Sequence, residues 1–132
     1  MNLTKGECFK REFHITDSMV KEFARVTGDN NPVHLDEEYA KTTVFRKRIA
    51  PGMLTGGLIS SVLGNDFPGI GTIYLSQTMR FTNPVFIEDQ VTVRIEVMEI
   101  KLNNWIRLKT ECSNQNNQLV VKGEAIIIPP GN

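Results

Sequence analysis

The sequence predicts an α+β domain in which an antiparallel sheet curls around one long helix. Two observations predict this class. A run rich in apolar residues begins at Pro51 without strict alternation, as expected of a buried helix. After Gly71 the apolar residues instead recur at every second position, as in strands with one buried face. A helix followed by closely spaced strands is therefore the expected layout.

Size and charge narrow the class of protein. The chain has 132 residues, which fit one domain, predicted to span residues 1–132. Its 15 Lys and Arg side chains balance 15 Asp and Glu side chains, so it lacks the positive excess typical of proteins that bind nucleic acid. No apolar run approaches the roughly 20 residues that span a bilayer. We therefore expect no nucleic-acid partner and no membrane partner.

The N-terminal residues lack the apolar core of a secretory signal, so the expected location is cytoplasmic. Disulfides are rare in that compartment. Cys8 and Cys112 show no motif spacing, and we expect two free thiols rather than a disulfide or a metal site.

The first predicted elements are a short strand and a helix. Residues 8–13 are expected to form a strand or an extended arm. Thr16 is a good N-cap, apolar residues then recur at helical spacing, and Gly28 is the usual residue just past a helix end. The pattern predicts a helix over residues 17–27.

The stretch GDNNPVHLD, residues 28–36, follows this helix. Pro32 disfavours a helical conformation at Asn31, and Asn31 can cap a turn that Pro32 begins. Asp36 can cap a short helix over residues 37–40. Turn geometry thus explains these three residues without any function.

The segment IAPGMLTGGLISSVLG is predicted to be a helix that begins at Pro51. Its apolar residues face almost all round the helix, which indicates burial on most sides. They are Met53, Leu54, Leu58, Ile59, Val62 and Leu63. The small residues between them allow other backbone to approach closely. Glycine and proline in residues 64–71 end the helix.

Four later segments have strand patterns. They span residues 72–81, 90–100, 105–113 and 118–128. Short, turn-rich connections join them, and we expect an antiparallel meander with one buried face. Such a sheet exposes its edge strands, and pairing two copies edge to edge is an economical way to cover them. We therefore expect a homodimer, or a higher homo-oligomer.

Asp29 and His34 are left without a structural explanation. Five residues of continuous helix would turn them about 140° apart, so only the break at Asn31-Pro32 can bring both side chains to one place. A carboxylate and an imidazole there form a general acid-base pair. A plain turn stays open as an interpretation. So does a metal site that adds Asp36, although one histidine is fewer than most catalytic metal sites use.

Gly52 stands near the start of the predicted buried helix, where the first N–H groups lack intrahelical partners. This end of a helix carries partial positive charge and can hold an oxyanion such as an enolate oxygen. Pro51 and Gly52 also suit an ordinary helix start. An acid-base pair together with an oxyanion site would suit proton chemistry beside a thioester carbonyl.

The loop resembles the signature of MaoC-like (R)-specific enoyl-CoA hydratases: Asp, a variable residue, Asn-Pro, a variable residue and His. Here the signature occupies residues 29–34. The similarity continues in the family's order through APGMLTGGLISSVLG, PGIGTIYLSQTMRFTNPVFIEDQVTV and GEAIIIP, and so covers nearly the whole chain. The resemblance implies a hot-dog fold, in which a curved antiparallel sheet wraps a long central helix and a short helical overhang carries the catalytic loop. It also implies a dimer with active sites at the subunit interface.

The resemblance further implies reversible syn hydration of trans-2-enoyl-CoA to (R)-3-hydroxyacyl-CoA. Asp29 and His34 would activate one water, with Asp29 the better candidate for the base. The N–H of Gly52 would bind the thioester oxygen, and Asn31 would help to shape the loop. No cofactor and no metal are implied, because coenzyme A is part of the substrate.

Other substrate contacts are less sharply defined. On the predicted central helix, Leu58, Ser60 and Leu63 are candidates to line an acyl tunnel, or else they belong to the core. Arg46 and Arg48 are candidates for contacts to the coenzyme phosphates, or else they form a solvated loop end. We expect a preference for short acyl groups.

One position departs from the family pattern. Many relatives have His-Gly-Met where this chain has Pro51-Gly52-Met53, a change that keeps the Gly amide but can alter loop rigidity. The expected single domain is in keeping with the short bacterial hydratases. Alternatives are a dehydratase of acyl-carrier-protein substrates and, less in keeping with the signature, a thioesterase. A non-catalytic acyl-thioester binding module is a third, although it has no need of both Asp29 and His34.

Overall fold

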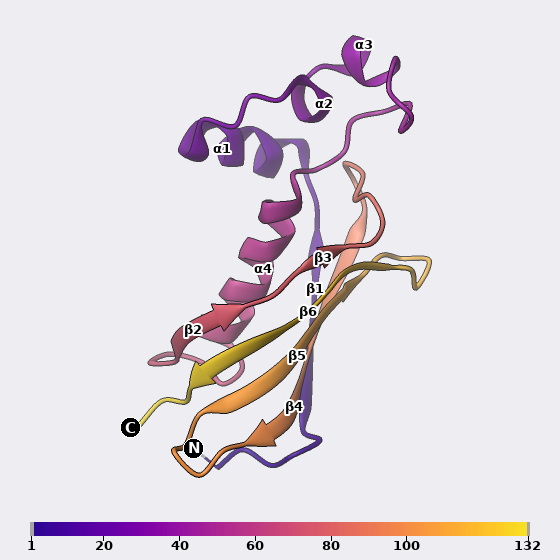
Figure 1. Ribbon diagram of the computed structural model, residues 1–132. Coiled ribbons are helices and arrows are strands. Elements are labelled where there is room, and N and C mark those ends of the chain that lie inside the picture. Colours follow the sequence, from indigo (N-terminus) through magenta and orange to yellow (C-terminus); the bar gives the residue numbers. More distant parts are fainter. Residues whose placement is uncertain (1, 132) are drawn as a thin grey trace.

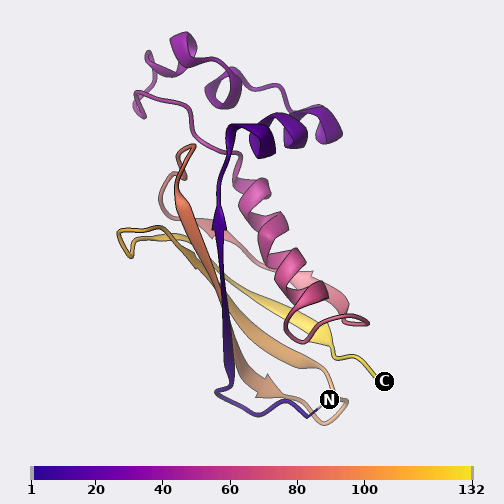
Figure 2. The ribbon, with the colours of Figure 1, turned by 180° about the vertical axis from the view of Figure 1, so that it is seen from behind.

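A six-stranded antiparallel sheet curves around one long helix in the computed structural model, which describes residues 2–131 (Figures 1 and 2). The elements follow the predicted α+β layout. In chain order they are β1 (Cys8–His14), α1 (Asp17–Thr27), α2 (Pro32–Leu35), α3 (Glu37–Ala40), α4 (Gly52–Asn65), β2 (Ile73–Gln77), β3 (Arg80–Phe81), β4 (Gln90–Ile100), β5 (Ile106–Ser113) and β6 (Leu119–Ile128).

Helix α1 begins and ends at the predicted residues. The hydroxyl of Thr16 accepts a hydrogen bond from the backbone N–H of Met19 at 3.1 Å, which satisfies a donor of the first turn. Gly28 has a φ of 76°, the left-handed conformation that glycine adopts without steric cost. The chain therefore leaves α1 abruptly and enters the loop that carries Asp29. Helices α1, α2 and α3 lie together beyond one end of the sheet, next to the start of α4 (Figure 1).

Helix α4 lies across one face of the sheet, as Figure 2 shows from behind. Its buried side chains pack against the alternating apolar residues of β4. From α4 and β4, the core holds Leu58, Ile59, Val62, Leu63, Val91, Val93, Ile95 and Val97. The expectation that α4 is buried on most sides was wrong for a single copy of the chain, which leaves one side of the helix exposed. Met53, Gly57, Ser60 and Gly64 form an exposed stripe, because the sheet covers only one side of the helix.

The sheet order is β1-β4-β5-β6-β2, with β3 also paired to β6. Strands β4, β5 and β6 form the predicted meander, but the segment predicted as its first strand does not lie beside β4 in the sheet. The segment over residues 72–81 crosses to the other edge instead and pairs with β6, because β1 already occupies the free edge of β4. A Cβ on Gly123 would lie 1.8 Å from the carbonyl oxygen of Thr78, so this glycine lets the chain cross between β2 and β3.

The outer edge of β2 has no partner strand among the described residues. Its apolar side chains Ile73, Tyr74 and Leu75 are exposed. Tyr74 and Leu75 border the exposed stripe of α4 around one shallow hollow that includes Met53 and Ser60. This edge and this stripe together form the β2–α4 surface.

Both cysteines are free thiols, as predicted; Cys8 is exposed and Cys112 is buried. In the described part of the chain, no helix has the length and apolar character needed to cross a membrane.

Candidate active site

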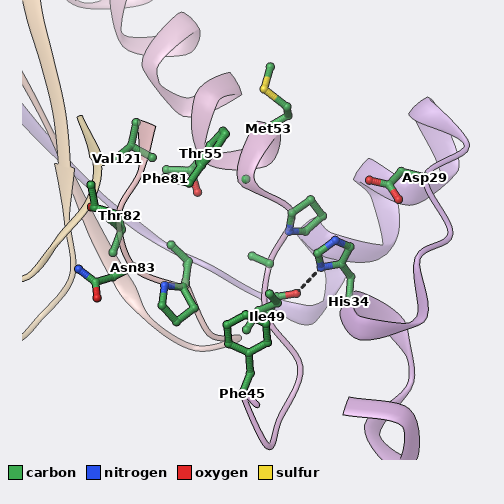
Figure 3. A pocket seen from close by; sticks show the side chains of 16 residues that line it. Asp29, His34, Phe45, Ile49, Met53, Thr55, Phe81, Thr82, Asn83 and Val121 are labelled. Carbon is green, nitrogen blue, oxygen red and sulfur yellow. Dashed lines mark hydrogen bonds between the residues drawn. The ribbon is translucent and has the colours of Figure 1, made fainter. Parts of the chain in front are cut away.

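The three residues predicted to carry the chemistry, Asp29, His34 and Gly52, meet at one cavity of about 510 Å³. Asp29 and His34 reach it from the helical overhang, and Gly52 reaches it from the first turn of α4. The segment that follows β3 closes the opposite side (Figure 3). Much of the wall is apolar, and it includes Phe45, Ile49, Ala50, Phe81, Pro84, Val85, Val120 and Val121.

His34 is held in one orientation by its ring. Its Nδ1 lies 2.7 Å from the backbone carbonyl oxygen of Ile49 (Figure 3). A carbonyl oxygen only accepts hydrogen bonds, so Nδ1 must be the protonated nitrogen. In the neutral ring Nε2 then keeps its lone pair and can accept a proton from water.

Arg48 fixes the backbone around His34. Its Nε donates to the carbonyl oxygen of His34 at 2.7 Å, and its Nη2 lies 2.6 Å from a carboxylate oxygen of Asp17. The positive charges of Lys21 and Arg48, both paired with this carboxylate, hold the pKa of Asp17 below its ordinary value. Only 11% of the Arg48 side chain is exposed. The guanidinium is thus engaged inside the fold, and it links α1 to the loop that bears His34.

Asp29 lies directly after the left-handed Gly28. Its backbone N–H donates to the hydroxyl of Thr27 at 3.1 Å, and its Oδ1 accepts from the N–H of Asn31 at 3.2 Å. Both contacts bend the loop sharply. In Figure 3 the side chains of Asp29 and His34 both face the cavity from the helical side.

Asn31 and Asp36 have the capping roles predicted from turn geometry. The side chain of Asn31 accepts a hydrogen bond from the N–H of Val33 at 3.3 Å, at the start of α2. Asp36 Oδ1 accepts from the N–H groups of Glu38 and Tyr39 at the start of α3. Asn31 thus contributes by holding Asp29 and the turn rather than by lining the cavity.

Gly52 brings the start of α4 into close contact with an aromatic ring. A Cβ at this position would lie 2.7 Å from Cε1 of Phe81, so only glycine lets that ring lie against the helix start. Pro51 precedes the helix and gives it no side-chain cap. The N–H of Leu54 donates to the Pro51 carbonyl at 3.1 Å, whereas Gly52 and Met53 begin the helix, have no intrahelical acceptor for their N–H groups, and line the cavity at its positive end.

The five other predicted substrate contacts on α4 and the basic loop lie away from this cavity. Leu58 and Leu63 are packed in the core, whereas Ser60 is exposed in the hollow beside β2. Arg46 is exposed, with a φ of 68°, and Arg48 is the structural link described above. Of the two arginines considered for the coenzyme phosphates, Arg46 alone has an exposed side chain.

Sequence reasoning missed several wall residues, among them Phe45, Thr55 and Asn83. Residues 82–89 carried only turn signals, and nothing in them indicated that they face the helical overhang. Thr55 had a usable signal, since it follows Gly52 by three positions and shares its side of a helix.

The residues do not group as a metal site would require. Within residues 2–131, no three His, Cys, Asp or Glu side chains are placed to hold one ion. The carboxylate of Asp36, the third ligand considered, caps α3 instead.

Comparison with known proteins adds a family to this geometry. Residues 4–119 match the profile described as the MaoC like domain. A 3-hydroxybutyryl-CoA dehydratase of Methylorubrum extorquens is 46% identical over 125 residues, which are 94% of this chain and 78% of that protein. An (R)-specific enoyl-CoA hydratase of Rhodospirillum rubrum is 41% identical over 98% of this chain and 90% of its own length.

Solved structures agree with the fold. The unliganded R-hydratase PhaJ1 from Pseudomonas aeruginosa superimposes with a TM-score of 0.95 at 46% identity, covering 98% of this chain and 84% of its own. The matches thus extend over the sheet, the long helix and the overhang alike.

Proposed function

The chain belongs to the MaoC-like domain family, and we propose that it is an (R)-specific enoyl-CoA hydratase, a hydro-lyase that also runs in the dehydration direction. The observation that carries the proposal is the meeting of Asp29, His34 and Gly52 around one cavity. These groups supply a carboxylate, an imidazole with a free lone pair, and backbone donors at a helix N-terminus.

In the proposed mechanism one water molecule binds between Asp29 and His34. It donates hydrogen bonds to the Asp29 carboxylate and to Nε2 of His34, which points its oxygen lone pair at C3 of a trans-2-enoyl thioester. The oxygen adds to C3 while Asp29 takes one proton. The C2–C3 π electrons shift toward the thioester carbonyl and form an enolate.

The enolate oxygen accepts a hydrogen bond from the N–H of Gly52, and the positive end of the helix stabilises its negative charge. C2 then takes the proton back from Asp29, and the carbonyl is restored. The net change is addition of one water to the double bond. Because both additions come from the Asp29–His34 side, they are syn. The configuration at C3 depends on which face of the double bond is turned toward these residues, and the 41% identical (R)-specific hydratase favours the face that gives the (R)-3-hydroxyacyl thioester. The reverse sequence is dehydration. No cofactor or metal ion enters the scheme, because coenzyme A is part of the substrate.

The proposed substrate is a short enoyl-CoA. The dehydratase with 46% identity is named for a four-carbon substrate, which favours a short acyl group here as well. The deep wall of the cavity is closed by Thr55, Val85, Val120 and Val121. Arg46, exposed on the loop that bears Phe45, is the candidate for a coenzyme phosphate contact.

We further propose that the active unit is a homodimer in the cytoplasm, built on the β2–α4 surface. At the mouth of the cavity Met53 is 55% exposed and Phe81 is 51% exposed. Exposed apolar side chains that gather in one patch mark interaction sites, and Met53 shares one hollow with Tyr74 and Leu75 of β2. A second copy that pairs along β2 would cover them and close the cavity from outside.

Turnover of crotonyl-CoA tests the proposal, since hydration removes the absorbance of the conjugated double bond. Comparing crotonyl-CoA with the same acyl group on an acyl carrier protein identifies the preferred carrier. Faster turnover on the protein-bound form would indicate a dehydratase of acyl-carrier-protein substrates. Tight binding measured by calorimetry with no turnover at any chain length would instead identify a binding module.

A further inference from the structure

Thr55 carries a buried hydroxyl that the fold does not use. The residue is 1% exposed in the first turns of α4, and its Oγ1 has no hydrogen-bond partner among residues 2–131. Leaving a buried hydroxyl unpaired costs free energy, so such a group calls for an explanation.

Other threonines in the helical part of the chain satisfy their hydroxyls locally. Thr27 donates to the carbonyl oxygen of Phe23 at 2.7 Å, four residues earlier in α1. Thr43, in the turn after α3, donates to the carbonyl oxygen of Ala40 at 2.7 Å, three residues earlier. This back-bonding is the usual fate of a helical threonine. Thr55 departs from it, because its hydroxyl is not bonded to the preceding turn.

The unpaired hydroxyl lies in the wall of the catalytic cavity. In Figure 3 its oxygen points off α4 into the cavity, and Asp29 and His34 lie on the other side. Thr55 follows Gly52 by three residues, so it is about 4.5 Å further along the axis and on the same side of the helix. Helical side chains lean toward the N-terminus, which brings the hydroxyl back toward the level of the first N–H groups.

We propose that Thr55 donates a hydrogen bond to the thioester oxygen of the substrate, as a second donor beside the N–H of Gly52. This role rests on the proposed hydratase function. During reaction the thioester oxygen becomes an enolate oxygen, and a donor fixed in a buried wall stabilises that charge without reorganisation. The thioester oxygen of the substrate is then the acceptor that the Thr55 hydroxyl lacks within the described part of the chain.

The decisive variant is Thr55→Val, which removes the hydroxyl and keeps the shape. A donor that acts mainly on the enolate lowers kcat and leaves KM nearly constant. We expect kcat to fall roughly 10- to 100-fold. The melting temperature should stay the same or rise, because an unpaired buried hydroxyl has been removed. Thr55→Ser keeps the donor and should retain most of kcat.

Thr110→Val is the matched control. Thr110 is fully buried in β5, and its hydroxyl accepts a hydrogen bond from Nε2 of Gln77 at 2.7 Å. Removing this satisfied hydroxyl should lower the melting temperature and leave kcat unchanged. The two valine variants should therefore show opposite patterns, which a purely structural role for Thr55 would not produce.

A spectroscopic readout tests the contact itself. Crotonyl-CoA is bound to the Asp29→Asn variant, whose turnover is expected to be slow enough for the measurement, and its thioester carbonyl stretch is measured by Raman difference spectroscopy. Adding Thr55→Val should move the band back toward its position in free crotonyl-CoA.

A wild-type kcat in Thr55→Val, or a loss of melting temperature that accompanies the loss of activity, would overturn the role of Thr55 alone. An unshifted carbonyl band would do the same. A wild-type protein that hydrates no enoyl thioester would overturn the proposed function, and the role of Thr55 with it.

Discussion

Nδ1 of His34 lies 2.7 Å from the carbonyl oxygen of Ile49, fifteen residues further along the chain. This contact decides the tautomer of the ring and leaves Nε2 as an acceptor. The contact joins the α2 segment to the loop that precedes α4. Among the described residues, one backbone hydrogen bond also joins these two segments, from the N–H of Ile49 to the carbonyl oxygen of Val33 at 3.3 Å. The orientation of His34 therefore depends on whatever holds these segments together.

Arg48 is the residue we expect to hold them. Arg48→Gln removes its hydrogen bond to the His34 carbonyl and its ion pair with Asp17. We expect the free energy of unfolding in urea to fall by about 1–3 kcal/mol and kcat to fall with it. Arg46→Gln is the control; this exposed arginine should change stability by less than about 0.5 kcal/mol, and a phosphate contact would appear as a higher KM. Unchanged stability in Arg48→Gln would contradict the linking role.

Gly52 should tolerate no side chain while Phe81 is present. A methyl group would lie 2.7 Å from the ring, so Gly52→Ala must displace either Phe81 or the helix start. We expect kcat/KM to fall at least about tenfold. The double variant Gly52→Ala/Phe81→Leu relieves the contact and should recover part of the loss in the same assay. Full activity in the single variant would show that the close approach is not needed.

The β2–α4 surface should control assembly. Leu75→Glu places a carboxylate on the exposed edge strand, where pairing with a second copy would bury it without a partner. Light scattering after size-exclusion chromatography should then show monomers, and hydration activity should fall. Leu102→Glu introduces the same charge at an exposed hairpin tip and should leave the mass unchanged. A Leu75→Glu protein that keeps the wild-type mass would place the interface elsewhere.

The two thiols should differ sharply in reactivity. Burial raises the pKa of Cys112 to about 12, so only about one thiol in ten thousand is ionised at pH 8, and the side chain is also shielded. A disulfide reagent should therefore label one cysteine per folded chain, Cys8, and both after unfolding in guanidinium. The Cys8→Ser variant should show no fast labelling. Rapid labelling of Cys112 in that variant would contradict the packing of β5.

Local chemistry made much of this structure predictable. The limits of α1, the caps by Asn31 and Asp36, and the alternation of β4 follow from interactions between residues a few positions apart. The sequence also singled out Asp29 and His34, because turn geometry left both unexplained. The structure brings them to one cavity with Gly52.

Long-range packing was not predictable in the same way. The strand pattern of residues 72–81 does not reveal which strand this segment pairs with. It pairs with β6 because β1 already occupies the edge of β4. The basic run around Arg48 suggested phosphate contacts, yet its partners are Asp17 and the His34 carbonyl, far away in sequence. Thr55 likewise stands out only in the structure, because its buried hydroxyl has no hydrogen-bond partner among the described residues.

The most direct test of the account is crotonyl-CoA hydration by Asp29→Asn and His34→Gln beside matched controls. Asp36→Asn makes the same change in the same loop at a helix cap, where asparagine serves as well, and His14→Gln alters the other histidine, an exposed partner of Glu88. We predict that Asp29→Asn and His34→Gln each lose about 10²- to 10⁴-fold in kcat, while both controls stay near wild type. Undiminished hydration in Asp29→Asn and His34→Gln would contradict the assignment of the site.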